Sequence, residues 1–347
     1  MALPDILYRG KTKNLRGKPG ASPYIIEFSD RYDAFGWGEM PDELQGKAAG
    51  LAFLAWFFFD HLGKPESWQD NALFAAVNGG ARLQRLQRDG LAHHMLGLAG
   101  GDLRPLSLER EILSPSKLLL VKPLAYPHDS VRDDQPADRV LPFALQFTFQ
   151  GDKPAIAFVS DEDGSAISPA TATSKGRLSA AELDELELLA KLVALRLRAT
   201  CKQVGADLAQ GTLHFAVTGT AGASPRDFML VDSLGPDELR MYIGQTELSQ
   251  DVLCQAYRGT NWMTAVEKAK AMASERGDRD WKRICQEELK AQPPLLSPIV
   301  KEKAAMVYKS LAREFCQRQY GKPVFATAWE LPRMVASLAP RPQKASA

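Results

Sequence analysis

The chain has 347 residues, 45% of them hydrophobic and 24% charged, which is the composition of a globular protein with one large domain or two smaller ones. Its formal net charge of +1 gives no global attraction to nucleic acid or to an anionic membrane, so neither is an expected partner. The most apolar window, residues 51–59, is too short to span a membrane, and no secretory signal is visible at the N-terminus. The four cysteines stand singly, which favours reduced thiols in a cytoplasm over disulfides or a zinc site.

The N-terminus predicts a hairpin. A short strand at 6–9 leads into Gly10, Lys11 and Lys13, a loop follows at 16–20, and the chain returns as a strand at 24–28. A glycine beside two lysines can bring backbone N–H groups and ammonium charges close to phosphates. The alternative is that these lysines are ordinary solvated surface.

A polar and aromatic turn at 29–35 follows the hairpin. Lys47 then precedes an apolar helix at 51–62, which is too hydrophobic for a surface element. Its aromatic run, 56–59, is expected to pack in the core rather than to bind a ligand.

Three arginines, Arg82, Arg85 and Arg88, recur at three-residue spacing and predict a solvated helical face. A strand is predicted at 117–122. The acidic turn at 161–164 lacks the spacing of a calcium-binding loop, so calcium is not indicated.

The middle of the chain predicts further strands around one long helix. A strand is expected at 143–149, and Ser179 with Glu182 forms a capping box at the start of the helix. The next two strands are predicted at 213–217 and 228–231.

The end of the last of these strands carries the most informative residues. Asp232 stands where the apolar run stops, the turn 235–236 follows, and Asp237 and Arg240 come on that turn. A carboxylate at a strand end suits a hard cation, and an Asp with an Arg can hold a polar substrate. The alternative is an ordinary strand followed by a capped turn.

The C-terminal part is predicted to be helical, with one segment at 261–291 and a final amphipathic helix at 299–318. The order of strands and helices predicts an α+β protein with a small N-terminal antiparallel-sheet lobe over a larger α/β body. The predicted divisions are a sheet lobe at 1–122, a substrate and metal domain at 123–338, and a disordered tail at 339–347.

Read together, these segments resemble the SAICAR synthetase family, purine-biosynthesis ligases that use ATP to join aspartate to a carboxyaminoimidazole ribotide. Residues 8–13 look like the family's phosphate-contacting hairpin, and 29–35 are similar to its Asp-Arg-Ile-Ser-Ala-Tyr-Asp segment. Lys47 and the aromatic helix match longer family members. Residues 231–242 resemble the Val-Asp-Glu-Val-x-Thr-Pro-Asp-Ser-Ser-Arg-Phe-Trp signature, and 295–321 look like the closing helix.

The resemblance implies a reaction in which ATP phosphorylates a carboxylate, an amine attacks the acyl phosphate, and ADP leaves. Its implied nucleotide contacts are Gly10, Lys11, Lys13, Lys122 and Asp232, and Asp232 would also be catalytic and hold Mg²⁺. Its implied substrate contacts are Asp33, Lys47, Arg132, Asp237 and Arg240.

The chain departs from the family where carboxylates are expected. The family strand Asp-Thr-Lys-Phe-Glu-Phe-Gly corresponds to Thr212–Thr218, with His214 and Ala216 at the Lys and Glu positions. The Glu that follows the strand-end Asp in the family is Ser233 here, so the Mg²⁺ site is predicted to be weakened. The Arg-x-x-Ala-Ala-Gly-Ser phosphate motif is absent, and Arg132 is its candidate remnant.

His214 is the candidate replacement, as a catalytic base or phosphate contact, because histidine changes charge near neutral pH. The alternative is a buried structural histidine. Three hypotheses follow: an ATP-dependent ligase joining an altered carboxylate to an amino acid such as aspartate, a nucleotide-binding paralogue without turnover, or a small-molecule kinase. A homo-oligomer stays open.

Overall fold

A computed structural model of the chain describes residues 3–126, 138–161, 164–219, 226–249, 251–278 and 280–338. The predicted disordered tail at 339–347 therefore lies outside the described residues.

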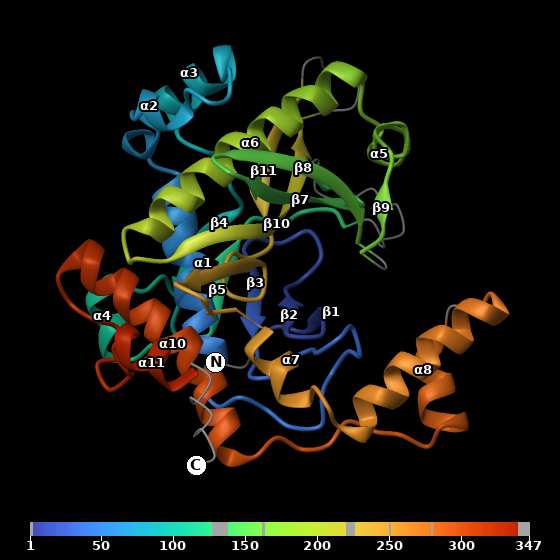
Figure 1. Ribbon diagram of the computed structural model, residues 1–347. Coiled ribbons are helices and arrows are strands. Elements are labelled where there is room, and N and C mark those ends of the chain that lie inside the picture. The colour runs from blue at the N-terminus through green and yellow to red at the C-terminus, as the bar shows by residue number, and fades with distance from the viewer. Residues whose placement is uncertain are drawn as a thin grey trace.

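The N-terminal part forms a five-stranded antiparallel sheet in the order β1-β2-β3-β5-β4 (Figure 1). The central strands β3 and β5 are buried along their whole length, whereas β1 lies at an edge and is exposed. The bounds are β1 (Ile6–Arg9), β2 (Lys13–Arg16), β3 (Tyr24–Phe28), β4 (Met95–Ala99) and β5 (Leu118–Val121).

Among the described residues, the second sheet has eight strands and is organised around β10 (Asp207–Thr218). The first half of β10 pairs with β12 and β7, and its second half pairs with β11 and β6, so one long strand serves two neighbours on each side. The other bounds are β6 (Arg139–Val140), β7 (Phe143–Gln150), β8 (Lys153–Ser160), β9 (Ala166–Ile167), β11 (Asp227–Val231), β12 (Leu239–Ile243) and β13 (Thr246–Glu247).

Helices cover both sheets. In Figure 1, α6 lies across the second sheet, and α1 runs through the middle of the molecule, where it packs against α10. The bounds are α1 (Lys47–Leu62), η1 (Pro65–Trp68), α2 (Asn71–Phe74), α3 (Gly80–Asp89), α4 (Leu108–Leu113), α5 (Pro169–Gly176), α6 (Ala180–Lys202), α7 (Asp251–Tyr257), α8 (Asn261–Arg276), α9 (Trp281–Arg283), η2 (Ile284–Glu288), α10 (Pro298–Tyr320) and α11 (Leu331–Leu338).

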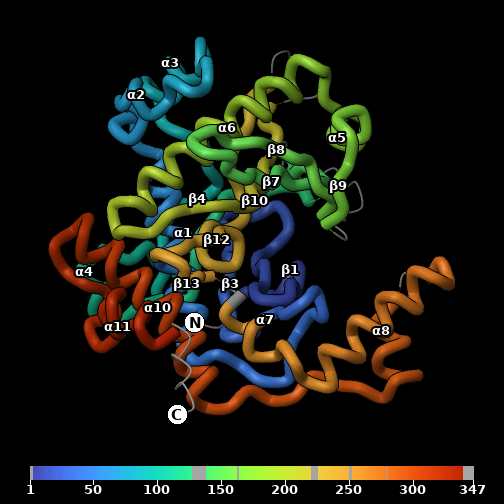
Figure 2. The backbone as a smooth tube through the Cα atoms, in the orientation of Figure 1, coloured from blue at the N-terminus to red at the C-terminus, as the bar shows by residue number. Residues whose placement is uncertain are grey.

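The buried apolar side chains of the described residues form one main core, a second sizeable cluster and two small ones. The main core joins the aromatic run of α1 to α6, α10 and both sheets. The second cluster packs α7, α8 and η2 against the segment that follows β3, with Trp37 and Trp262 in edge contact at 5.3 Å between ring centroids. Figure 2 shows α8 extending away from the rest of the chain.

Most predicted elements are confirmed. The confirmed strands are those predicted at 6–9, 24–28, 117–122, 143–149, 213–217 and 228–231, and the confirmed helices are those at 51–62 and 299–318. The long helix begins with the predicted capping box, in which the Ser179 hydroxyl and the Glu182 carboxylate each bond the other's backbone N–H. The apolar helix begins at Lys47 itself, four residues earlier than predicted.

Three local predictions were wrong. Lys13 begins a strand of its own, β2, because Gly10 turns the chain and its N–H bonds the Lys13 carbonyl at 2.9 Å. The helix predicted at 261–291 is interrupted at Gly277, which has a left-handed φ of 64°. Arg82 is buried and lies 2.6 Å from the Asp227 carboxylate, so this arginine does not belong to a solvated face.

The α+β architecture is as predicted, with an antiparallel N-terminal sheet, a second sheet and C-terminal helices. The division at residue 122 stays a prediction, and the main core contains residues from both sides of it, such as Phe28 and Phe215. Within the described ranges, none of the helices combines the length and apolar character that a bilayer crossing requires.

Candidate active site

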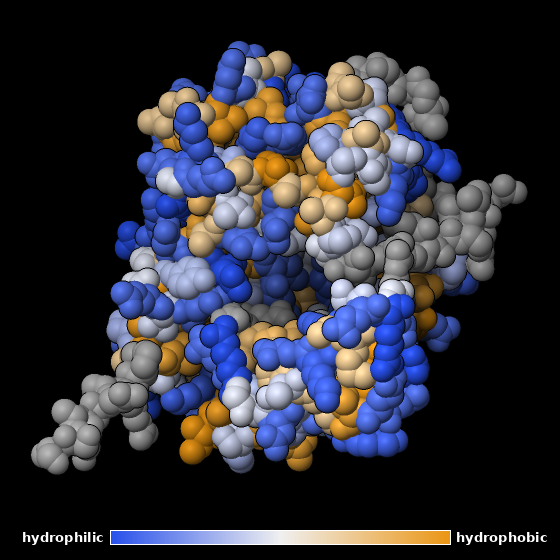
Figure 3. All heavy atoms as spheres, turned by 45° about the vertical axis from the view of Figure 1, so that its right-hand side comes forward, coloured by the Kyte–Doolittle hydropathy of each residue, from blue (hydrophilic) through white to orange (hydrophobic). Residues whose placement is uncertain are grey.

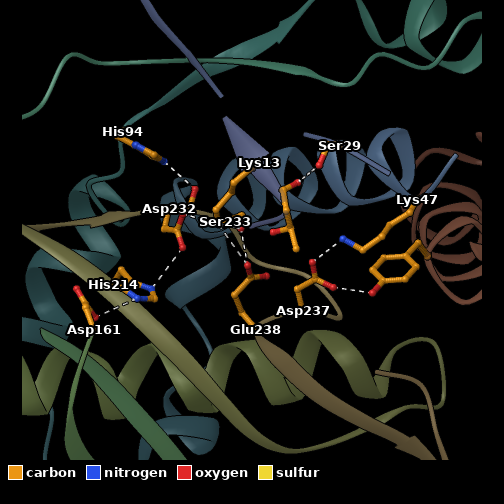
Figure 4. Close-up of polar contacts among 12 residues, drawn as sticks. Lys13, Ser29, Lys47, His94, Asp161, His214, Asp232, Ser233, Asp237 and Glu238 are labelled. Carbon is orange, nitrogen blue, oxygen red and sulfur yellow. Dashed lines mark hydrogen bonds and ion pairs between the residues drawn. The ribbon is translucent and has the colours of Figure 1, made fainter. Parts of the chain in front are cut away.

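Two segments that lie far apart in the sequence meet at the Lys13 side chain. Lys13 reaches from β2 toward the turn that follows β11, where its Nζ lies 2.5 Å from Asp232 Oδ1 and donates to Ser233 Oγ at 2.7 Å. Glu238, at the far end of the same turn, places Oε1 at 3.5 Å from this ammonium group (Figure 4). The basic hairpin and the strand-end acid are therefore in direct contact.

The chain leaves β11 in an uncommon conformation that aims the Asp232 side chain at this cluster. Asp232 has a left-handed φ of 71°, and its carbonyl oxygen accepts a hydrogen bond from His94 Nε2 at 3.0 Å. Burial lowers the pKa of His94 to about 4, so the ring is neutral and carries its proton on Nε2. A Cβ at Gly235 would collide with Leu51 of α1, so the turn can approach this helix closely only with glycine there.

The charges of the cluster stabilise each other. Burial alone would lower the pKa of Lys13, but the carboxylates of Asp232 and Glu238 outweigh it and raise the pKa to about 12. Burial would raise the pKa of Asp232, but Lys13 and His214 hold it below its usual value. Burial raises the pKa of Glu238, and Lys13 only partly opposes this shift. Lys13 and Asp232 are thus a charged pair, and Glu238 takes up a proton more readily than an exposed glutamate.

His214 lies between two carboxylates. It faces Val231 across the β10–β11 ladder, with Nδ1 at 3.5 Å from Asp232 Oδ2 and Nε2 at 3.4 Å from Asp161 Oδ1. Burial would lower its pKa, but Asp161 and Asp232 raise it above the usual value. His214 and Asp232 are therefore neighbours, and the two carboxylates favour the charged form of this histidine.

A second ion pair uses the same turn. Lys47, at the start of α1, donates to Asp237 Oδ2 at 2.7 Å, and Tyr308 of α10 donates to Asp237 Oδ1 at 2.6 Å. The Lys47 side chain has no exposed surface, and that of Asp237 is 8% exposed. Two predicted substrate contacts therefore bind each other inside the protein.

The remaining hairpin residues lie nearer the surface. Lys11 is mostly exposed and forms an ion pair with Asp33 at 3.0 Å, so these two predicted ligand contacts are also adjacent. Lys122 is exposed just after β5, and its backbone N–H donates to the carbonyl oxygen of His94 at 2.8 Å.

Arg240 does not accompany Asp237. It lies in β12 rather than on the turn, is about half exposed, and forms an ion pair with Glu247 at 3.0 Å. The turn ends before Arg240, because Leu239 already enters the ladder with Gly211 of β10. Arg132, the other predicted substrate-binding arginine, lies outside the described residues.

A metal site would have to use few protein ligands. Among the residues that the structure describes, no three His, Cys, Asp or Glu side chains converge as a ligand set. Asp232 and Glu238 both face Lys13, however, and Glu238 Oε2 is buried without a hydrogen-bond partner there. Mg²⁺ commonly binds one or two carboxylates and completes its shell with waters and substrate phosphates, so these residues fit that ion.

Four residues of the site were missed in the sequence. Glu238 stands beside the singled-out Asp237, and Asp161 stands in the acidic turn that was judged only as a calcium loop, so both had a usable signal. Tyr308 stands in the segment matched to the closing helix, but nothing in its spacing indicates Asp237 as its partner. His94 had no signal at all.

The molecular surface is recessed on one face. Figure 3 shows a hollow near the centre of this face, with mostly hydrophilic residues around it. A concave surface with a few converging polar groups is the usual form of a small-molecule site.

Comparison with known proteins gives a consistent result. No family model matches the chain. A protein of Archaeoglobus fulgidus, whose name marks it as a candidate phosphoribosylaminoimidazole-succinocarboxamide synthase, is 25% identical over 319 residues, which cover 87% of this chain and 90% of that protein.

Solved structures share the fold. The phosphoribosylaminoimidazole-succinocarboxamide synthase of Ehrlichia chaffeensis aligns with a TM-score of 0.50 at 16% identity, over 84% of this chain and all of that one. The SAICAR synthase of Saccharomyces cerevisiae, solved with SAICAR, aligns with a TM-score of 0.53 at 14% identity, over 92% of this chain and 96% of that one.

By fold, the protein belongs to the α+β class represented by these synthases. The resemblance seen in the sequence motifs is thereby confirmed: the chain is similar in sequence to one such synthase and shares its fold with others.

Proposed function

We propose that the protein is an ATP-dependent, ADP-forming ligase. It would join a carboxylate substrate to the amine of an amino acid such as aspartate through an acyl phosphate, with an acceptor that differs from the purine intermediate. The four single, unbridged cysteines fit the cytoplasm as the place of this activity.

The contact between Lys13 and Asp232 carries the proposal. These residues are 219 positions apart in the chain, yet their side chains lie 2.5 Å apart at the end of β11. A lysine and a carboxylate at one place can serve a nucleotide, the lysine by binding phosphate oxygens and the carboxylate by binding the accompanying metal. Neither residue is sealed off, since their side chains are 22% and 27% exposed.

Each charged side chain around the Lys13–Asp232 pair has a role in the proposed reaction. Lys13, assisted by Lys11 from the turn just before it, would hold the phosphates, because the two lysines stand only two residues apart. Asp232 would hold Mg²⁺, which neutralises phosphate charge during phosphoryl transfer. His214 would orient the Asp232 carboxylate and carry positive charge beside it.

The surroundings of His214 support a changed acceptor. Ala216, at a family Glu position, is fully buried in a small apolar cluster with Val140 and Met229. Apolar side chains cannot replace the hydrogen bonds of a carboxylate. The acceptor is therefore expected to lack the polar groups that a carboxylate at this position would recognise.

The test is product formation. Purified protein is incubated with ATP, Mg²⁺, a panel of carboxylates that includes the purine ribotide, and a panel of amino acids, and ADP and adducts are followed by mass spectrometry. An amide adduct formed together with ADP is the expected result. Phosphate transfer to a hydroxyl compound without an amine would instead indicate a small-molecule kinase.

A second candidate is a nucleotide-binding protein without turnover. It is favoured by the internal pairing of Lys13 with Asp232, which neutralises both groups without any ligand. This candidate predicts that ATP or ADP raises the unfolding temperature whether or not Mg²⁺ is present. The absence of ADP with every tested pair of substrates would exclude the ligase and leave this candidate.

A further inference from the structure

The carboxylate of Glu238 is incompletely bonded in the interior. Its Oε1 accepts a hydrogen bond from Ser233 Oγ at 2.6 Å and lies 3.5 Å from Lys13 Nζ. Its Oε2 has almost no exposed surface and no hydrogen-bond partner among the described residues. Buried polar atoms are nearly always paired, so an unpaired one calls for a partner such as a proton, a water, an ion or a ligand.

The neighbours of Glu238 indicate a cation. Asp232 and Glu238 both face the Lys13 ammonium, which is the positive charge that lies between them. Under the proposed function, Lys13 binds the phosphates of the nucleotide. When it does so, Asp232 and Glu238 lose the positive charge that lies between them, and their mutual repulsion favours the binding of a cation.

Glu238 supplies a carboxylate on the same turn on which Ser233 replaces the glutamate of the family signature. Ser233 stands directly after Asp232, where the family signature has Glu, and its side chain carries no carboxylate. Its hydroxyl instead bonds Glu238, five positions further along the same turn. The turn is held in this shape by the Glu238 N–H, which donates to the Gly235 carbonyl oxygen at 3.0 Å.

We propose that Glu238 is the second carboxylate ligand, beside Asp232, for the divalent cation that accompanies the nucleotide, and that Ser233 positions it. The metal site is therefore relocated within the turn rather than lost. This inference rests on the proposed function, because the cation enters together with the nucleotide phosphates.

The experiment measures ATP binding by isothermal titration calorimetry with and without Mg²⁺, and needs no turnover. Wild-type protein is compared with Glu238→Gln, which keeps the size and the Ser233 contact, and with the exposed control Glu302→Gln. Wild-type and control protein are expected to bind ATP more tightly with Mg²⁺. Glu238→Gln is expected to lose at least about tenfold of the Mg²⁺-dependent affinity, as for other groups that support metal ligation.

Metal-free binding shows whether each variant is folded. Glu238→Gln is expected to bind ATP without Mg²⁺ at least as tightly as wild type, because it removes a negative charge near the phosphates. A second variant, Ser233→Glu/Glu238→Ser, is expected to regain the Mg²⁺ dependence by moving the carboxylate back along the turn.

The outcomes separate the two proposals. If Glu238→Gln keeps the full Mg²⁺ dependence of wild type, the assignment of Glu238 is overturned while nucleotide binding stands. If wild-type protein binds no ATP with or without Mg²⁺, the proposed function is overturned and the assignment with it.

Discussion

One turn of the chain forms two lysine–carboxylate clusters of different character. In the closed cluster, Lys47 and Asp237 are almost completely buried, and Tyr308 satisfies the second carboxylate oxygen. In the open cluster, Lys13 and Asp232 keep about a quarter of their side-chain surface exposed. Beside them, Glu238 Oε2 has no hydrogen-bond partner among the described residues.

The difference in exposure between the two clusters indicates a structural role for one ion pair and ligand binding for the other. A buried ion pair with every oxygen bonded has no capacity for a ligand, and its loss leaves an uncompensated charge in the core. A partly exposed pair with unpaired neighbours can exchange its internal contacts for those of a ligand. The family resemblance grouped Lys47, Asp237 and Arg240 as substrate contacts, and the geometry favours a stabilising role for the first two.

The largest effect is expected when one partner of the closed Lys47–Asp237 cluster is removed, and this change tests the contrast between the two clusters. Asp237→Ala leaves the Lys47 ammonium buried without a counter-charge, and the free energy of unfolding is expected to fall by about 3–5 kcal/mol. Urea unfolding measures this change. The control Lys47→Met/Asp237→Leu removes both charges and is expected to recover most of the loss. A change below about 1 kcal/mol in Asp237→Ala, as for an exposed pair, would contradict the closed assignment.

The matching change in the open cluster is Lys13→Met. It is expected to weaken ATP binding by about 10- to 100-fold, because charge-assisted hydrogen bonds to phosphate are lost. It is expected to reduce stability less than Asp237→Ala does, since Lys13 is partly exposed. Calorimetry and urea unfolding of the same samples check both statements. The comparison fails if Lys13→Met unfolds the protein but leaves the ATP affinity of the folded fraction unchanged.

Glu111 is a buried carboxylate without a lysine partner among the residues that the structure describes, and it shows what burial alone does to the pKa of such a group. Glu111 is buried, forms no ion pair with a described residue, and accepts bonds from the Ser116 N–H on both oxygens. Burial raises its pKa from 4.5 to about 7, against a small opposing effect of this N–H.

The sign of the pH effect follows from this shift. Between pH 4.5 and 7, the folded protein holds the Glu111 proton more tightly than the unfolded chain, so stability falls as the pH rises through that window. Glu111→Gln cannot ionise and is expected to be more stable than wild type at pH 8, by on the order of 2 kcal/mol. The difference is expected to shrink toward pH 4.5, and a pH-independent difference in urea unfolding would contradict the account.

The smallest effect is expected at an exposed pair. Arg88 and Asp89 are neighbours on the surface at 2.7 Å, and both side chains are at least half exposed. Arg88→Ala is expected to leave the free energy of unfolding almost unchanged in urea unfolding, because water screens this pair. A loss comparable to that of Asp237→Ala would show that burial does not decide which ion pairs matter here.

The sequence predicts those features that depend on local pattern. The apolar run before Asp232 and the capping box of α6 are formed by residues close together in the chain, and both were predicted. The meeting of Lys13 and Asp232 was predicted as well, through the resemblance to a family whose motifs come in the same order.

The rest depends on contacts between distant segments. Nothing around His94 shows that its ring donates to the Asp232 carbonyl oxygen, because that contact joins residues 138 positions apart. Arg240 was placed on the turn because its spacing from Asp237 suited a shared substrate, but pairing with β10 draws it into a strand. Glu238 was overlooked because the motif directed attention to the loss at Ser233 and not to its replacement.

The central claim is that a nucleotide is bound between the basic hairpin and the turn after β11. A crystal structure with a non-hydrolysable ATP analogue and Mg²⁺ tests it most directly. The account predicts phosphate oxygens on Lys13 and the cation on Asp232 and Glu238, with the Lys47–Asp237 pair unchanged. A nucleotide bound elsewhere, with Lys13 still paired to Asp232, would contradict it.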